Sequence, residues 1–256
     1  MRNGIILDGR EYPLPTGWND LSESQYLALC GMELSEMRSV LLQNALWCLL
    51  PIDKPMKRTV LRNRLSDEQV YDMTYPIRWL LEDTGPTKQL LPCIRFGRKA
   101  YYGPAEHFAD MSWGEYEAAE HWMRAYAKGD KQALVQLVAT LYRPHVKRKR
   151  VPFDSYLMAV QASELNKLPE SMLMGVYLWM VATHRWLTND SKYASIWGEN
   201  GGSKQEVPGW GPVMRAVAGN YIDIDKAARM PLYDALEELL ERKKEYQDRI
   251  KQARKR

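Results

Sequence analysis

The chain has few of the residues from which disulfide frameworks and metal sites are built. Only three cysteines occur among 256 residues, Cys30, Cys48 and Cys93, and no two of them form a C-x-x-C pair. An odd number of widely spaced cysteines argues against a disulfide framework and indicates reduced thiols in a cytoplasmic protein. The four histidines are scattered, and no H-E-x-x-H or EF-hand pattern occurs. We therefore predict neither a metal nor a cofactor.

Motifs for phosphate binding and covalent catalysis are also missing. The segment from Gly198 to Lys204 superficially resembles a phosphate-binding loop, but its spacing is wrong and no helix opening follows it. The sequence contains no G-x-S-x-G elbow, and no cysteine has a neighbouring histidine that would activate its thiol as a nucleophile. Asp223 and Asp225 form a carboxylate pair that is better explained as the cap of a helical turn. We predict that the chain is not an enzyme.

Long apolar runs are absent too. The most apolar window, from Met172 to Leu187, contains His184 and Arg185, which makes it too short and too polar to cross a bilayer. No signal peptide follows Met1. The net charge of +4 is too mild to imply nucleic-acid or membrane binding by itself. We expect a protein of the cytoplasm without a membrane partner.

Helix and turn signals fill most of the chain. Short apolar stretches flank Asp8-Gly9 and Gly97-Arg98, a pattern that predicts two β-hairpins. Capping and breaking residues predict helices over about 22–32, 35–50 and 231–256. His121 and His184 fall in predicted helices among aromatic residues, where a partly buried structural histidine is expected. The predicted fold class is mainly α: a multi-helix bundle with two short β-hairpins and a long C-terminal helix.

Part of this order occurs twice along the chain. Gly97 lies 88 residues after Gly9, Tyr116 lies 90 after Tyr26, and the proline that closes the second helix recurs after 93. A diverged tandem duplication of hairpin, helix, helix, basic connector and helix explains this match, and chance agreement between two helix–helix segments is the alternative. We predict a first repeat-like unit over 1–90, a second over 91–197, and a loop with a C-terminal helical region over 198–256.

Aromatic residues are abundant, with nine tryptophans and fifteen tyrosines against three phenylalanines. Because Trp and Tyr carry a polar tip, they suit the rim of a core or an interface. The helix that begins near Met172 is apolar all round, which favours burial, and a groove for an apolar segment of another chain is the alternative. Late in the C-terminal helix only two apolar side chains interrupt a polar run. The candidate partner-binding residues are Met172, Tyr177, Trp179, Trp186, Trp210, Tyr246 and Ile250.

The densest basic patch spans residues 143–150. Such a run can neutralise phosphates, but Val151-Pro152-Phe153 follows it, so we expect a loop and not a groove-reading helix. A solvated connector between helices is one alternative, and a contact for an acidic protein surface is another. The candidate residues are Arg143, Lys147, Arg148, Lys149 and Arg150.

Two segments, 15–26 and 137–144, resemble proteins encoded in the tail gene clusters of phages and prophages of the Bacteroides group. A third set of short pieces, 209–214, 218–219, 223–225 and 231–236, resembles the C-terminal region of phage tail assembly chaperones. The resemblance implies a helical cytoplasmic protein without an active site that binds the tape-measure protein while the tail tube forms. We therefore expect a tail assembly chaperone whose partners are the tape-measure and tail tube proteins. A structural virion component, such as a connector or tail-completion protein, and a nucleic-acid-binding accessory protein using the 143–150 loop are alternatives. Self-association is left open.

Overall fold

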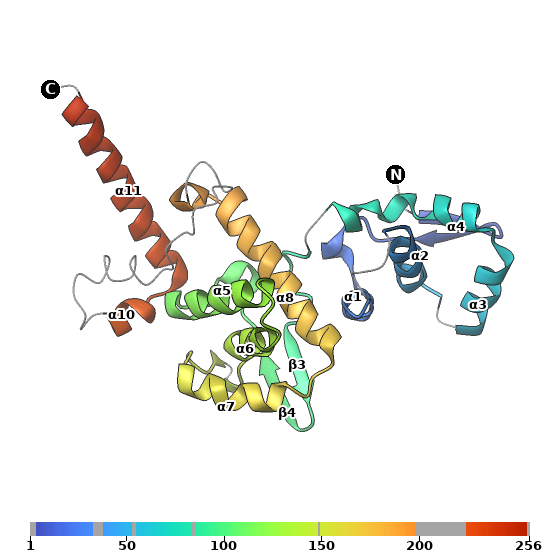
Figure 1. Ribbon diagram of the computed structural model, residues 1–256, viewed down its shortest axis with the longest axis horizontal. Coiled ribbons are helices and arrows are strands. Elements are labelled where there is room, and N and C mark those ends of the chain that lie inside the picture. Colours follow the sequence, from blue (N-terminus) through green and yellow to red (C-terminus); the bar gives the residue numbers. More distant parts are fainter. Residues whose placement is uncertain are drawn as a thin grey trace. The chain divides into compact units, whose positions relative to one another are not determined.

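The computed structural model describes residues 4–32, 38–52, 55–82, 85–147, 149–197 and 224–254. These residues are mainly helical, and their strands form short two-stranded antiparallel sheets (Figure 1). The predicted mainly α, multi-helix class is therefore confirmed. Residues 198–223, where the predicted loop and C-terminal helical region begin and which include Asp223, lie outside the described residues.

The chain divides into two compact units. Unit 1 comprises Met1–Leu90 together with Pro169–Trp179, and unit 2 comprises Leu91–Leu168 together with Met180–Arg256. The first segment of unit 1 ends at Leu90, where the first predicted domain also ends. Residues 169–179, which we placed in the second repeat-like unit, belong to unit 1, and the segment after residue 197 belongs to unit 2.

Unit 1 begins with a hairpin and continues in short helices. Its elements are β1 (Gly4–Leu7), β2 (Arg10–Pro13), the 3-10 turn η1 (Trp18–Asp20), α1 (Glu23–Cys30), α2 (Arg38–Leu49), α3 (Pro55–Arg64), α4 (Asp67–Met73), the 3-10 turn η2 (Tyr75–Leu81), and the first turns of α8 (Glu170–Arg185).

Polar tips of buried aromatic residues hold unit 1 together. The hydroxyl of Tyr26 in α1 donates to the Gly175 carbonyl of α8 at 2.5 Å. The indole N–H of Trp179 donates to the carbonyl of Thr87 at 3.3 Å. These bonds satisfy the polar ends of rings that the core otherwise surrounds with apolar atoms. Burial of Tyr26 and Trp179 ties residues 169–179 to the N-terminal segment.

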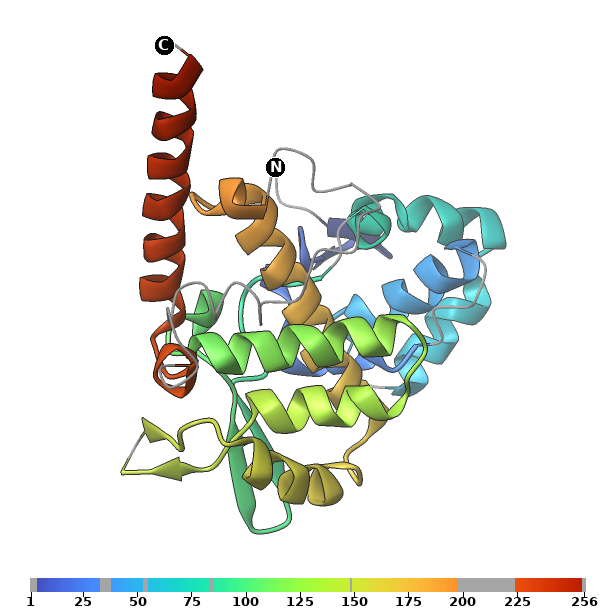
Figure 2. The same ribbon diagram turned by 60° about the vertical axis from the view of Figure 1, so that its left-hand side comes forward.

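Unit 2 begins with a second hairpin, followed by a pair of longer helices. Its elements are β3 (Cys93–Phe96), β4 (Lys99–Tyr102), the 3-10 turn η3 (Glu106–Phe108), α5 (Trp113–Ala127), α6 (Gln132–Leu141), β5 (His145–Val146), β6 (Lys149–Arg150), α7 (Ser155–Leu165), the last turns of α8, the π-helical turn η4 (Trp186–Asp190), the 3-10 turn η5 (Ala194–Trp197), α10 (Ile224–Ala228) and α11 (Leu232–Arg254). In unit 2, α6 lies between α5 and α7 (Figures 1 and 2).

Both predicted hairpins are present. In the first, Leu7 pairs with Arg10 across a two-residue loop in which Asp8 and Gly9 both have positive φ. Asp and Gly tolerate this conformation, and its twist matches that of the strands. In the second, Phe96 pairs with Lys99 across a loop whose Gly97 has a φ of 58°.

The order hairpin, 3-10 turn, helix, helix occurs in both units. β1, β2, η1, α1 and α2 follow this order in unit 1, and β3, β4, η3, α5 and α6 repeat it in unit 2. The first helix of each set is capped by a serine, Ser22 in α1 and Ser112 in α5. After the second helix the orders differ, because α3 follows in one unit and the β5–β6 hairpin in the other.

Candidate functional site

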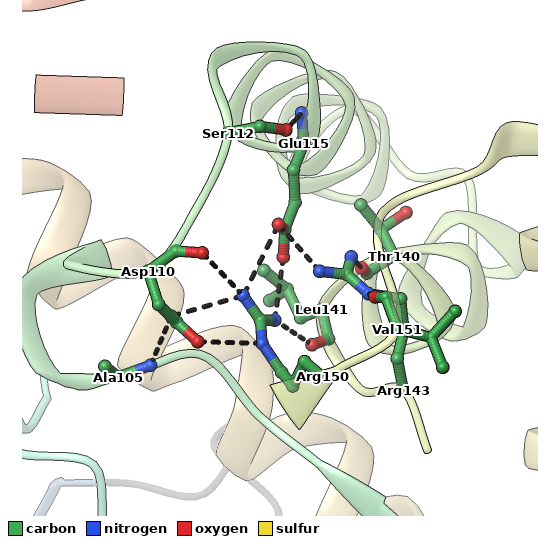
Figure 3. A network of polar contacts seen from close by, with 9 residues as sticks. All are labelled: Ala105, Asp110, Ser112, Glu115, Thr140, Leu141, Arg143, Arg150 and Val151. Carbon is green, nitrogen blue, oxygen red and sulfur yellow. Dashed lines mark hydrogen bonds and ion pairs between the residues drawn. The ribbon is translucent and has the colours of Figure 1, made fainter. Parts of the chain in front are cut away.

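The charged groups that converge in unit 2 centre on Glu115, in the first turn of α5 (Figure 3). Its Oε2 accepts a hydrogen bond from Arg143 Nη2 at 2.8 Å, and its Oε1 accepts one from Arg150 Nη1 at the same distance. All three side chains are buried. Ser112 caps α5 by accepting from the Glu115 N–H, and this cap fixes where the helix begins and where the Glu115 side chain starts.

Arg150 uses both edges of its guanidinium. Besides Glu115, it donates from Nη1 to the Leu141 carbonyl at 2.8 Å and from Nε to Asp110 Oδ2 at 3.0 Å. The Leu141 carbonyl ends α6, so Arg150 satisfies a helix-terminal acceptor as well as pairing with two carboxylates. The planar fork of an arginine suits this set of acceptors, whereas a lysine ammonium does not present the same fixed geometry.

Arg143 completes the network from the other side. Its Nε donates to the Val151 carbonyl at 2.7 Å and its Nη1 to the Thr140 carbonyl at 2.8 Å. Its backbone pairs with Tyr102 at the end of β4, so the chain after α6 is fastened to the hairpin edge. The two arginines and the two carboxylates of Glu115 and Asp110 balance formally, which offsets the desolvation of buried charges.

The basic patch therefore separates into inward and outward side chains. Arg143 and Arg150 turn inward to Glu115, and the residues between them form the β5–β6 hairpin instead of the loop that we expected. The physical reason is that two inward arginines, seven residues apart, bring the ends of the stretch together. Lys147 and Lys149 are exposed, and Arg148 lies outside the described residues.

The corresponding position of α1 uses different chemistry. Gln25 has the same place after its capping serine as Glu115 has after Ser112, and its Nε2 donates to the Leu49 carbonyl at 2.9 Å. Leu49 ends α2 as Leu141 ends α6. An amide reaches the helix-terminal carbonyl directly, whereas a carboxylate has no proton to donate and requires Arg150 as an intermediary. Both units thus satisfy the carbonyl that ends their second helix, unit 1 with the Gln25 amide and unit 2 with the Arg150 guanidinium.

A second polar cluster lies between α5 and the end of α8. Tyr116 Oη and His184 Nδ1 lie 2.7 Å apart, and Arg124 pairs with Glu120 at 2.7 Å. Burial, together with the positive charge of Arg124, lowers the pKa of His184 to about 4. His184 is therefore neutral near pH 7 and accepts at Nδ1 from the Tyr116 hydroxyl. Burial also raises the pKa of Tyr116, which keeps its hydroxyl a donor.

The predicted partner-binding residues have different environments. Trp179 is only 1% exposed, with its indole bonded inside unit 1. Met172, Tyr177, Trp186 and Ile250 are half-buried. Tyr246 is 65% exposed on α11, and Trp210 lies outside the described residues. Among the described members of this set, exposure is greatest at Tyr246, which projects mainly into solvent.

An exposed apolar face on α7 was missed. Tyr156 and Val160, four residues apart, are 78% and 55% exposed, and Leu157 beside them is 44% exposed. The opposite face, with Met158, Ala162 and Leu165, packs inward, and Ala162 and Leu165 are buried. The sequence held a signal for this face, because Tyr156 to Val160 are apolar without a break and one packed face of a helix cannot cover them all. We call Tyr156, Leu157 and Val160 the α7 face.

Unit 1 also exposes apolar and aromatic side chains. Met56 and Val60 stand four residues apart on α3 and are exposed. Tyr71 and Tyr75 are exposed beside Arg78, whose guanidinium carbon lies 4.3 Å from the ring centroid of Tyr75. An arginine over a tyrosine face is a cation–π contact.

The described residues hold neither a metal-binding cluster nor a membrane-spanning helix. Within them, no group of three or more His, Cys, Asp and Glu side chains is placed to hold a metal ion. None of the described helices combines the length and apolar character needed to cross a bilayer. No family model, curated protein or solved structure matches this chain.

Proposed function

We propose that this protein is a non-enzymatic tail assembly chaperone that binds the tape-measure protein, the tail tube protein, or both, during phage or prophage assembly. The observation that carries the proposal is the α7 face, because three adjacent large apolar side chains stand in solvent on one helix. An exposed apolar cluster of this kind marks a surface that another macromolecule covers. The resemblance of the three sequence segments supplies the identity of the expected partners.

The binding mechanism needs no chemistry at the α7 face. Asp154 caps the helix by accepting from the N–H groups of Tyr156 and Leu157, so the face is held on a rigid element. An apolar stretch of a long helical client would lose water by packing on Tyr156 and Val160, and the tube protein would later replace the chaperone. Both client binding and the later replacement by the tube protein would be driven by the burial of apolar area, which requires no covalent step and no specific side-chain chemistry.

The convergent charged groups support a binding role over a catalytic one. Glu115, Arg143 and Arg150 are buried and bonded to one another and to backbone carbonyls, so their polar atoms serve the fold. Of the basic patch, two inward arginines are committed in this way, which leaves fewer cations for phosphates. We therefore place nucleic-acid binding behind protein binding.

Capture of the client tests the proposal. The chain is co-expressed with a tape-measure protein from a phage tail gene cluster, and the complex is isolated and titrated at micromolar concentration. The double variant Tyr156→Glu/Val160→Glu should weaken capture at least tenfold, because two carboxylates would be desolvated at the interface. A matched control, Asn63→Glu/Gln132→Glu, adds the same charge at exposed polar positions and should bind like the parent. Absence of a complex with the parent chain, or equal capture by both variants, would refute the proposal.

A structural virion component is the second candidate, and α11 favours it. This helix extends well beyond the helices on which its first turns pack in unit 2, as an assembly arm would (Figures 1 and 2). Mass spectrometry of purified particles separates the two candidates. A chaperone leaves before the particle is complete, whereas a connector or tail-completion protein stays in stoichiometric amount.

A further inference from the structure

The long helix α11 carries a seven-residue repeat whose positions are apolar except at Lys243. With alternating steps of four and three, the repeat takes in Leu232, Leu236, Leu239, Lys243, Tyr246, Ile250 and Ala253. These are the a and d positions of a heptad, with Leu236, Lys243 and Ile250 at a. A repeat of this type places one seam on one side of a helix and suits pairing with a second helix.

The described residues of unit 2 cover the first half of this seam and leave the second half open. Leu232 and Leu236 are buried, and the Lys243 ammonium donates to the Ser195 carbonyl of η5. Beyond that contact, Tyr246 is mostly exposed and Ile250 is half-buried. In both views the helix there continues away from the other elements of unit 2 (Figures 1 and 2). We call the seam from Tyr246 to Ala253 the distal seam.

The charges of α11 are sorted with respect to the seam. All the acidic residues of the helix fall at positions b, c and f, away from the seam: Asp234, Glu237, Glu238, Glu241, Glu245 and Asp248. The flanking g positions next to the open seam are Arg242 and Arg249. In coiled coils the e and g positions set partner choice through charge pairs, so this flank selects acidic residues opposite it.

The arginines of the flank now pair within their own helix. Arg242 contacts Glu238 at 2.6 Å and Arg249 contacts Glu245 at 3.4 Å, each four residues away. Both pairs are solvent-exposed. Exposed pairs of this kind contribute little, so their arginines exchange readily for an acidic residue across an interface that also excludes water.

A second copy of the chain fits the distal seam poorly. A parallel pair of α11 helices would place Lys243 against its own copy at an a position, and an antiparallel pair would bring arginines at g positions together. Like charges at these positions disfavour self-pairing. The occupant must therefore supply apolar a and d residues together with acidic flanks.

We propose that the distal seam of α11 docks a partner helix that carries apolar a and d residues and Glu or Asp at its e and g positions. The inference deepens the proposed function by naming the chemistry of a partner segment, and it rests on that function for its biological setting only. A long helical client can hold such a segment, and the α7 face remains a separate surface.

A synthetic peptide pair tests the proposal on the full-length chain. One peptide has three heptads with Ile at a, Leu at d and Glu at e and g, and the matched peptide carries Lys at e and g. Fluorescence anisotropy at low salt should show the acidic peptide binding at least tenfold more tightly than the basic one. This preference should shrink as salt is raised, because the flanking charges are exposed.

Variants of α11 separate the contribution of the flanking charges from that of the apolar seam. Arg242→Glu/Arg249→Glu should reverse the preference toward the basic peptide, while Asp248→Asn, at an f position, should change neither affinity. Ile250→Ala should weaken both peptides and leaves the flanking charges intact, so it reports on the apolar seam even where a charge reversal perturbs the helix. Equal binding of the two peptides, or no binding of the acidic one, overturns the proposal. A failure here leaves client capture through the α7 face unaffected, so the two proposals fail separately.

Discussion

Glu115 shows how one side chain can decide the course of a whole segment. Its two oxygens hold Arg143 and Arg150, which stand at the two ends of the basic patch. Charges taken out of water are tolerated only when they are paired and hydrogen-bonded, and removal of one partner leaves the others uncompensated. The network therefore contributes more to the choice of this hairpin conformation than to net stability.

Removal of the Glu115 carboxylate tests this role. Glu115→Ala should lower the free energy of unfolding by about 3–5 kcal/mol, because two buried arginines would lose their shared counter-charge. Urea denaturation followed by tryptophan fluorescence measures the loss. The control Glu245→Gln alters an exposed pair with Arg249 and should leave the midpoint nearly unchanged. Equal midpoints for Glu115→Ala and the parent would show that the network is dispensable.

His184 predicts a pH dependence of stability. Its pKa is about 4 in the folded protein and 6.5 when unperturbed, so between these values the unfolded chain binds more protons than the folded one. Stability contributed by the neutral imidazole is present above pH 6.5 and is lost as the pH falls toward 4, by up to about 3 kcal/mol.

The variant His184→Gln isolates that contribution, since glutamine keeps an acceptor for Tyr116 but does not titrate. Urea midpoints are measured at pH 7, 5.5 and 4.5 for both proteins. The parent should lose more stability than the variant over this range. Parallel pH curves would contradict a depressed pKa at His184.

At the scale of elements, the start of α5 and the α10–α11 junction are fastened together. Trp113 N–H donates to the Met230 carbonyl at 2.8 Å, and Leu232 N–H donates to the Met111 carbonyl at 2.9 Å. Gly114 lies against Ala228 of α10 so closely that an added Cβ would stand 2.9 Å from the Ala228 Cβ. This close approach sets the point from which α11 departs.

Gly114→Ala should therefore destabilise the protein by roughly 1–3 kcal/mol, because the added methyl group overpacks the α5–α10 contact. Thermal unfolding monitored by circular dichroism provides the measurement. Gly17→Ala is the matched control, since Gly17 has an extended backbone and no neighbour within 4 Å of the added carbon. A Gly114→Ala protein as stable as the control would mean that α10 moves freely away from α5.

At the scale of the molecule, the chain passes between its two units three times. Unit 1 takes its last segment, 169–179, from a helix whose remaining turns belong to unit 2. Tyr26 and Trp179 show why, because the polar tip of each buried ring donates to a backbone carbonyl in the other segment of unit 1. Neither segment of unit 1 buries these rings without the other.

Fragment complementation tests this dependence. Residues 1–90 alone should lack cooperative thermal unfolding, because the Gly175 and Trp179 contacts are missing. Addition of a peptide spanning 169–185 should restore near-ultraviolet dichroism from Trp18 and Trp79. A peptide with Trp179→Ala serves as the control and should restore much less. Cooperative unfolding of 1–90 alone would contradict the assignment of residues 169–179 to unit 1.

Much of the architecture followed from local sequence signals. Asp8-Gly9 and Gly97-Arg98 predicted the two hairpins because so few residues accept positive φ in a two-residue loop. The long C-terminal helix followed from its apolar spacing, and α11 spans Leu232–Arg254. These features depend on neighbours within a few residues, so a sequence carries them without knowledge of the tertiary fold.

The roles of individual side chains depended on distant parts of the chain. Arg143 and Lys147 read alike in a basic run, yet one is buried against Glu115 and the other is exposed, because the Glu115 carboxylate of α5 bonds the arginines at the two ends of that run and Lys147 lies between those ends. Trp179 and Tyr156 read alike as aromatic helix residues, yet only Trp179 meets a packed core. Local chemistry specified the helices and turns, whereas burial and charge pairing were settled by contacts between segments far apart in sequence.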